Sequence, residues 1–235
     1  MSSRRNALAA SLTALETRLS AACAAAGRNR DDVRLVAVSK TRPVEDVVDL
    51  AGLGVRDFGE NRDQEAGAKV AAYADAGGPG VRWHFVGGLQ TNKALSVAAY
   101  ADVVHSVDRD TLVQALSHGA VRVGREVDVL LQVSLDDDPA RGGVVVSGVR
   151  ALADRTAAAP GLRLAGVMAV APLGADPAEA FAALADVAAQ VRADHPGATA
   201  VSAGMSGDLE EAITAGATYV RVGTALFGPR PPALR

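Results

Sequence analysis

The chain has 235 residues, of which 49% are hydrophobic, 22% charged and 3% aromatic, and its net charge is −3. This composition is that of a globular protein of one large or two small domains, and it excludes a disordered chain, a collagen-like fibre and a disulfide scaffold. The single cysteine, Cys23, can form neither an internal disulfide nor a cysteine-based zinc cluster, and we expect it to be a small buried hydrophobe. The small net charge makes nucleic acid and membranes unexpected as partners.

Helix-like and strand-like segments alternate along the chain. Residues 1–27 predict an amphipathic helix rather than a signal peptide, because Glu16 and Arg18 interrupt the apolar residues. No stretch is long and apolar enough to span a membrane, so we expect a cytoplasmic protein. Eight strands are predicted at 34–40, 55–60, 81–87, 102–107, 127–134, 162–170, 198–202 and 219–223. Helices are predicted between them at 44–53, 61–74, 92–101, 110–119, up to 158, 177–194 and 207–215.

The alternation indicates the fold class. Each helical spacer is long enough for a right-handed crossover, so the strands should be parallel. Eight such units in roughly 200 residues predict a single α/β domain over residues 1–235, a closed (β/α)8 barrel with an extra N-terminal helix. An open doubly wound sheet is the alternative, but no G-x-G-x-x-G sequence follows the first strand.

Function in such a barrel collects at the C-terminal ends of the strands. The loops after the last two strands, residues 202–208 and 222–228, consist mostly of small residues. Exposed backbone N–H groups there are typical of a phosphate site. The alternative is a plain helix-capping loop with Ser206 or Asp208 as the N-cap.

The lysines are conspicuous because the chain has only three of them among its 24 basic residues. Lys40 ends the first predicted strand after mostly apolar residues. An apolar barrel mouth would lower its pKa, and a neutral amine can form a Schiff base with an aldehyde. An aldehyde that carries a phosphate suggests pyridoxal 5′-phosphate (PLP), with Arg221 facing the pyridine nitrogen. A lysine that extends from the strand end into solvent is the alternative.

The remaining lysines, the histidines and the acidic run give weaker indications of a functional site. Lys93, in the first turn of a helix, either meets an acidic neighbour such as Glu60 or is a solvated surface lysine. Lys69 is interpreted as a helix-surface residue without a role. His84 is expected to be a hydrogen-bonded core histidine, and no histidine spacing resembles a zinc motif. The acidic run 136–138 is interpreted as a solvated loop.

Seven stretches at the predicted strand ends resemble, in order, those of the PLP homeostasis proteins, also called YggS/PROSC-like proteins. They are VAVSK (36–40), FGEN (58–61) with QE (64–65), HFVGGLQTNK (84–93), HSVDR (105–109), LAGVM (164–168), SAGMSGD (202–208) and VRVGTALFG (220–228). The resemblance covers nearly the whole chain. One departure lies in the loop after the fifth strand, where the family usually has a lysine and this chain reads DPARGG (138–143).

The resemblance implies a barrel like the PLP-binding domain of bacterial alanine racemase, with PLP as the cofactor and Lys40 as its Schiff-base lysine. It implies that Asn61 and Met168 line the cofactor and that Arg221 approaches its ring nitrogen. It also implies phosphate contacts from Ser202, Met205, Ser206, Gly207, Gly223 and Thr224. It implies no catalytic residue and no metal site.

The expected function is PLP homeostasis, in which the protein buffers or carries PLP without turnover. PLP and PLP-dependent apo-enzymes are its expected partners, and it is expected to be a monomer or a weak homodimer. A PLP-dependent racemase is the first alternative, but a racemase needs a second acid/base group, and the tyrosines Tyr73, Tyr100 and Tyr219 are not at strand ends. A PLP-free enzyme that forms a Schiff base between its substrate and Lys40 is the second alternative.

Overall fold

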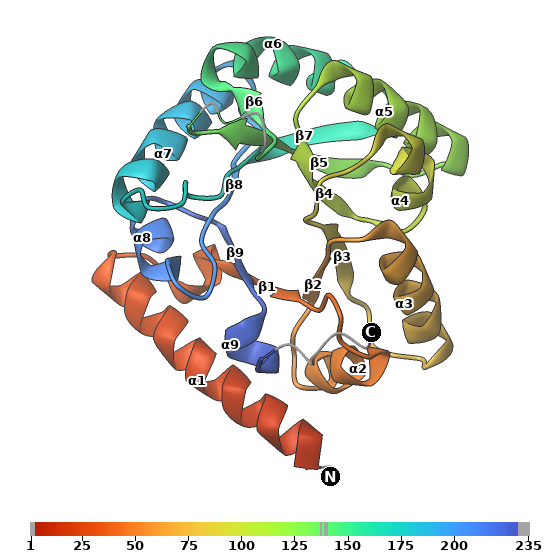
Figure 1. Cartoon of the computed structure of the whole chain (residues 1–235), viewed down its shortest axis with the longest axis vertical. Coiled ribbons are helices and arrows are strands. Elements are labelled where there is room, and N and C mark those ends of the chain that lie inside the picture. Colours follow the sequence, from red (N-terminus) through yellow and green to blue (C-terminus); the bar gives the residue numbers. More distant parts are fainter. Residues whose placement is uncertain (1–2, 137, 139–140, 230–235) are drawn as a thin grey trace.

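Parallel strands form a closed barrel in the computed structural model, which describes residues 3–136, 138 and 141–229 (Figure 1). Pairing of β4 with β5 and of β1 with β9 closes the ring, so the predicted (β/α)8 fold is confirmed. The barrel strands in this part of the chain are β1 (Arg34–Val38), β2 (Asp57–Glu60), β3 (Arg82–Phe85), β4 (Val103–Val107), β5 (Val127–Ser134), β7 (Leu162–Met168), β8 (Ala200–Ser202) and β9 (Tyr219–Val222). A further two-residue strand, β6 (Val144–Val145), pairs only with the end of β5.

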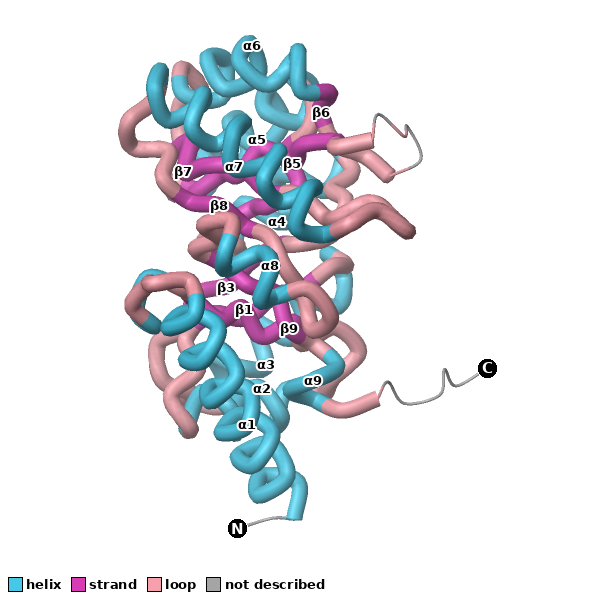
Figure 2. Tube along the Cα trace, turned by 90° about the vertical axis from the view of Figure 1, so that its left-hand side faces the viewer, coloured by secondary structure: helices cyan, strands magenta, loops and turns pink. Residues whose placement is uncertain are grey.

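The helices lie outside the strands, as Figure 2 shows from the side. They are α1 (Ser3–Ala25), α2 (Val44–Gly52), α3 (Asp63–Asp75), α4 (Ala94–Tyr100), α5 (Asp110–Val123), α6 (Val146–Ala157), α7 (Pro177–Asp194), α8 (Leu209–Thr214) and α9 (Thr224–Phe227), with short 3-10 helices η1 (Arg30–Asp32) and η2 (Thr91–Lys93). The bounds of α7 agree with the prediction because Pro177 occupies its first turn and Asp176 caps it. No helix among the described residues is both long and apolar enough to cross a bilayer.

Helix α5 runs four residues beyond its predicted end at Gly119. A Cβ on Gly119 would lie 3.0 Å from Cα of Leu95, so this glycine permits close packing of α5 on α4 rather than ending the helix. The helix ends instead at Gly124, whose φ of +66° is the left-handed conformation of a C-cap. The prediction was wrong because a glycine inside a helix was interpreted as its end.

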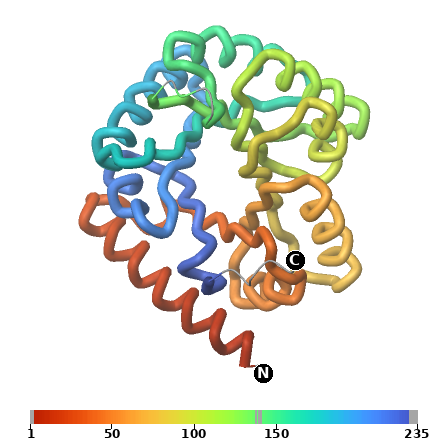
Figure 3. The backbone as a smooth tube through the Cα atoms, in the orientation of Figure 1, coloured from red at the N-terminus to blue at the C-terminus, as the bar shows by residue number. Residues whose placement is uncertain are grey.

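The extra N-terminal helix, α1, packs beside α2, α8 and α9 (Figure 3). Leu8, Leu15 and Leu19 bury its inner face, and Cys23 is buried there too, as predicted. Arg18 pairs with Glu210 of α8 at 2.5 Å. Through these contacts α1 also supports the loop that precedes α8.

The interior of the barrel is unusually polar. Bulky aliphatic side chains normally fill such an interior in layers. Here Val36, Val103, Leu130, Met168 and Tyr219 form one small apolar cluster in the interior. Charged and hydrogen-bonding side chains of β2, β3, β4, β8 and β9 are buried beside it. The larger apolar clusters lie between the strands and the helices and hold the barrel together.

Candidate functional site

Most of the predicted site residues come from five strands that are neighbours in the barrel. The strand order places β7, β8, β9, β1 and β2 side by side. Lys40, Asn61 and Gly223 follow the ends of β1, β2 and β9. Met168 and Ser202, the last residues of β7 and β8, are register partners. The topology therefore gathers these residues at one edge of the C-terminal mouth of the barrel.

Lys40 lies on a tight turn just beyond the end of β1 and is half-buried. The N–H of Arg42 donates to the carbonyl oxygen of Ser39 at 3.0 Å and closes the turn. Thr41, the residue after Lys40, has a φ of +63°, and it is the only non-glycine residue with a positive φ in the described part of the chain. A β-branched residue in this region is strained, so the surrounding structure must hold the turn in place.

Arg221 is buried at the centre of the site. Its guanidinium donates to Oγ of Ser202 at 2.6 Å and to the carbonyl oxygen of Ala169 at 3.0 Å. Burial lowers the pKa of Arg221 to about 10, so the side chain still carries its positive charge at neutral pH. The barrel thus holds a fixed cation below the mouth, where Arg221 was predicted to face a ring nitrogen.

A chain of hydrogen bonds connects Arg221 to Asp57 across the interior. Oγ of Ser202 lies 2.9 Å from Nδ1 of His105, and Nε2 of His105 lies 2.8 Å from Nδ1 of His84. Nε2 of His84 lies 2.8 Å from Oδ1 of Asp57. One arrangement of protons satisfies every link: each group donates toward Asp57, and both histidines are neutral. His84 is therefore a hydrogen-bonded core histidine, as predicted.

The charges at the two ends of this chain suit that arrangement. Burial lowers the pKa of His84, although Asp57 opposes the shift, and burial lowers the pKa of His105 well below its usual value. Burial raises the pKa of Asp57, but the hydrogen bond from His84 and the charge of Arg82 outweigh it, so the net shift is downward. Neutral imidazoles thus separate a buried cation from a buried carboxylate.

We expect acid to destabilise the protein through this histidine pair. Because the folded state keeps His84 and His105 neutral while the unfolded chain protonates them near pH 6.5, their contribution is complete above that pH and falls below it. The free energy of unfolding should therefore fall as the pH is lowered from 7.5 to 5.5. Denaturant unfolding of the wild type and of His105→Asn at pH 7.5 and 5.5 measures it. The pH dependence should be weaker in the variant, and equal dependence would contradict the assignment.

The β8–α8 loop partly matches the predicted phosphate site. Gly204, with a φ of +84°, brings the loop so close to α8 that a Cβ would lie 2.6 Å from that of Ala212. The N–H groups of Ser206 and Gly207 donate to no backbone carbonyl among the described residues. The N–H of Met205 already donates to Oδ1 of Asp208 at 2.6 Å.

The alternative interpretation of this loop, a helix cap, is only partly right. Asp208 is the N-cap residue of α8, but its side chain makes no capping bond, because it accepts from the loop instead. Arg18 of α1 donates to the carbonyl oxygen of Ser206 at 2.7 Å and turns that carbonyl toward α1. Arg18 of α1 and Asp208 of the loop itself therefore fix the conformation of the loop.

A hollow of about 540 Å³ opens beside Asn61, between the loops after β2 and β3. Gln90 and Lys93 line it, together with the charged residues at the start of α3. Gly87 permits the close approach of these loops, because a Cβ there would lie 2.3 Å from the carbonyl oxygen of Asn61. Nζ of Lys93 lies 4.0 Å from Asp63, so Lys93 has an acidic neighbour as expected, but this neighbour is Asp63 and not Glu60.

Lys69 is not the helix-surface residue that the sequence predicts, because its side chain is 6% exposed and Nζ lies 2.6 Å from Oε1 of Glu60. Ser39, just before Lys40, also contacts this pair. The scarcity of lysine in the chain was a signal for Lys69 as well as for Lys40.

The loop after β5 carries the departure from the family pattern. Arg141 pairs there with Asp136 at 2.5 Å and donates to the carbonyl oxygens of Val170 and Ala171 in the loop after β7. Part of the predicted acidic run, Asp137, lies outside the described residues. In the described part of the chain no group of His, Cys, Asp or Glu side chains could hold a metal ion.

The chain is similar to known proteins over nearly its whole length. The family described as "Alanine racemase, N-terminal domain" matches residues 10–231. Curated relatives named "Pyridoxal phosphate homeostasis protein" include one from Mycobacterium tuberculosis, 45% identical over 97% of this chain and 94% of its own length. Another, from Escherichia coli, is 35% identical over 96% of this chain and 97% of its own length. This chain belongs to the pyridoxal phosphate homeostasis protein family.

Solved structures agree with the membership in this family. PipY of Synechococcus elongatus, in its structure with PLP bound, matches with a TM-score of 0.82 and 36% identity over 94% of this chain and 100% of that chain. A protein from Bifidobacterium adolescentis matches with a TM-score of 0.90 and 31% identity over 97% of each chain. Alanine racemase of Corynebacterium glutamicum, at 16% identity, has a TM-score of 0.67 over 98% of this chain and 63% of that chain, which shows the shared fold alone.

Proposed function

We propose that this protein binds PLP as a Schiff base on Lys40 and serves PLP homeostasis, as a buffer or carrier without catalytic turnover. The observation that carries the proposal is the convergence of an amine after β1, a buried cation on β9 and small-residue turns after β8 and β9, three neighbouring strands. The curated relatives named for PLP homeostasis and the PLP-bound structure of PipY support it.

The residues present fit PLP in charge and in donor chemistry. The N–H groups of Ser206 and Gly207, with those of Gly223 and Thr224, would hold the phosphate, since small-residue turns let backbone donors approach an anion. Asn61, Met168 and the half-exposed Met205 would line the cofactor. Arg221 would face the pyridine nitrogen, and Ser202 would hold Arg221 rather than touch the phosphate, because its Oγ accepts from that guanidinium.

The chemistry proposed for Lys40 is a reversible condensation. A neutral Lys40 amine would condense with an aldehyde, forming a carbon–nitrogen double bond and releasing one water. PLP, when bound, would supply this aldehyde and an electron-withdrawing ring. Arg221 would disfavour a proton on the ring nitrogen and so weaken the ring as an electron sink. A reversible bond with a weakened ring suits storage of the aldehyde better than bond breaking in an amino acid.

The positions of the tyrosines support a role without turnover. A racemase needs an acid/base group on each face of the reacting carbon. Tyr219 lies at the start of β9, with its hydroxyl 3.5 Å from Arg82 at the start of β3 and hence far from the mouth. Tyr73 donates to the carbonyl oxygen of Pro79, and Tyr100 is the last residue of α4. Tyr73 and Tyr219 therefore lie away from the mouth in the part of the chain described.

Reactivation of an apo-enzyme tests the proposal directly. The purified protein is loaded with PLP, freed of excess cofactor and mixed with a PLP-dependent apo-enzyme at neutral pH. We expect titration to give a visible absorbance band that saturates at one PLP per chain, reactivation of the apo-enzyme, and no racemisation of alanine or other amino acids. A protein that PLP cannot titrate would overturn the binding proposal, and steady racemase turnover would overturn the assignment as a non-enzyme.

A further inference from the structure

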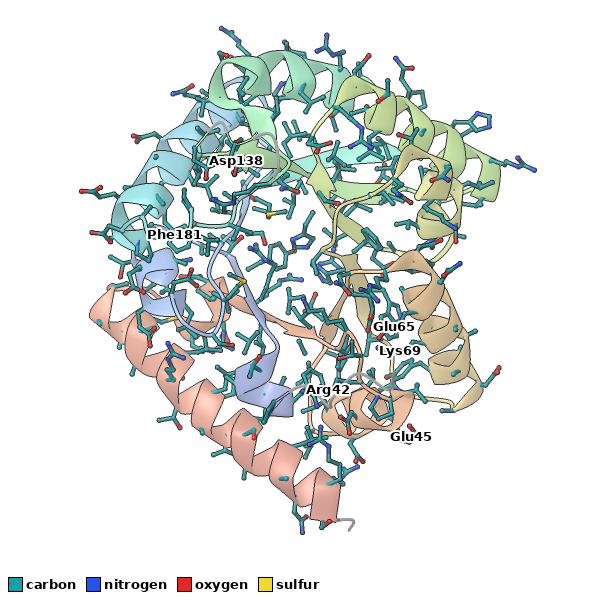
Figure 4. All side chains as sticks on the ribbon, in the orientation of Figure 1. Arg42, Glu45, Glu65, Lys69, Asp138 and Phe181 are labelled. Carbon is teal, nitrogen blue, oxygen red and sulfur yellow. The ribbon has the colours of Figure 1, made fainter. Side chains whose placement is uncertain are left out.

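The turn that carries Lys40 is held by an ionic cluster that the proposed chemistry does not use. Nζ of Lys69 donates to the carbonyl oxygen of Ser39 at 2.7 Å, to Oε1 of Glu60 at 2.6 Å and to Oε1 of Glu65 at 3.2 Å. The three protons of the ammonium group therefore have three acceptors. Figure 4 shows Glu65 and Lys69 side by side on α3, near the turn that contains Arg42.

The cluster forms hydrogen bonds with both residues that flank Lys40. On one side, Oγ of Ser39 donates to Oε1 of Glu60 at 2.6 Å, while its carbonyl accepts from Lys69. On the other side, the N–H of Thr41 donates to Oε1 of Glu65. Lys40 thus lies between two anchored residues, and both anchors depend on the same ammonium group.

This arrangement also accounts for the backbone of Thr41. A φ of +63° at a β-branched residue is unfavourable by itself, so the chain adopts it only where neighbours enforce it. The turn allows the N–H of Thr41 to donate to Glu65, and Lys69 holds Glu65 in place.

The ion pair between Lys69 and Glu60 is buried, with the Glu60 side chain 1% exposed. Burial raises the pKa of Glu60, although Lys69 opposes the shift. Such a pair is a poor source of stability but specifies one geometry.

We propose that Lys69, with Glu60 and Glu65, positions Lys40 for condensation with an aldehyde by holding the Ser39–Arg42 turn in its strained conformation. Lys69 is a positioning residue and forms no bond to PLP. This inference deepens the proposed function and rests on Lys40 as the lysine that forms the Schiff base. The order of the Ser39–Arg42 turn, however, is a property of the protein without PLP, so it can be measured separately.

The first test removes the cluster and measures the turn without PLP. Lys69→Met is combined with Glu60→Gln, so that no buried carboxylate is left without a counter-charge. Hydrogen exchange at the Thr41 and Arg42 amides should become about tenfold faster or more, the equivalent of one lost hydrogen bond, while the β5 amides keep their protection. Arg150→Met with Asp194→Asn, which removes an exposed ion pair between α6 and α7, is the matched control and should change neither. Unchanged exchange at the turn would overturn the proposal.

A second test separates the hydrogen bond at Thr41 from the charge. Glu65→Ala removes the acceptor for Thr41 N–H, whereas Glu65→Gln keeps an acceptor oxygen. We expect Glu65→Ala to slow formation of the visible PLP band about tenfold and Glu65→Gln to stay near the wild type. Equal rates in the two variants would contradict the role of that bond. These single changes on a partly exposed residue also decide the matter if the Lys69 double variant fails to fold.

A third test asks whether the strain at Thr41 is the reason for the cluster. Glycine adopts a positive φ without steric cost. Adding Thr41→Gly to the Glu65→Ala variant should therefore restore most of the lost rate, while Thr41→Gly alone should behave like the wild type. Failure to restore the rate would overturn the strain argument. If the wild type itself forms no band with PLP, the proposed function fails, and the exchange measurement still decides whether the cluster orders the turn.

Discussion

Lys40→Ala should abolish the covalent PLP adduct and leave the barrel folded. The change removes the amine that forms the carbon–nitrogen double bond, and no other group of the predicted site can replace it. Lys40 is half-buried on a turn beyond the end of β1, so the free energy of unfolding should change by about 1 kcal/mol or less. Absorbance spectra during PLP titration and denaturant unfolding curves measure the two effects.

The control for this variant is Lys40→Arg, which keeps the charge and much of the length. Arginine does not lose its proton in a protein, so it cannot supply the neutral amine. Both variants should therefore lack the visible band, which shows that charge alone is not enough. A band of wild-type intensity in either variant would remove Lys40 from the proposed chemistry.

Arg221→Glu should have the second large effect. A carboxylate in place of the guanidinium would favour a proton on the pyridine nitrogen, so the absorption spectrum of bound PLP should shift. It would also leave Ser202 and the carbonyl oxygen of Ala169 without their donor and bury a negative charge, which should cost about 2 kcal/mol or more of stability and weaken PLP binding. Spectra at saturating PLP and unfolding curves measure these effects.

Arg221→Lys is the matched control because it keeps a cation at the same place. Its spectrum should stay close to that of the wild type, although it donates fewer hydrogen bonds than the guanidinium. The difference between the spectra of the Glu and Lys variants reports the effect of the sign of the charge, because both variants lose the guanidinium. If the Glu and Lys variants give the same spectrum, Arg221 does not face the ring nitrogen.

The fold could be predicted from the sequence because its signals are local. Each βα unit carries its own alternation of apolar residues, and the predicted range 177–194 agrees with α7, which has Pro177 in its first turn. Gly119 misled the prediction, since a glycine that permits helix packing and a glycine that ends a helix look alike in one sequence. The four-residue α9 was predicted only as a turn, because such a short helix has no periodicity.

The candidate site was predictable only in part. The rule that function lies at strand ends selects Lys40, Asn61 and Gly223 as candidates, and the structure places all three at the same mouth of the barrel. The chain from Arg221 through the histidines to Asp57 was not predicted, because its members lie far apart in sequence and only closure of the barrel brings them together. Lys69 was missed for the same reason: helix position suggested a surface residue, and its partners Ser39 and Glu60 come from other elements.

The covalent attachment point is the central claim. Borohydride reduction of the PLP-treated protein would fix any Schiff base as a stable amine, and digestion with mass spectrometry of the peptides would locate it. The account predicts one reduced pyridoxyl group per chain, on the peptide that contains Lys40. A label found on Lys69 or Lys93 instead, or no label at saturating PLP, would contradict it.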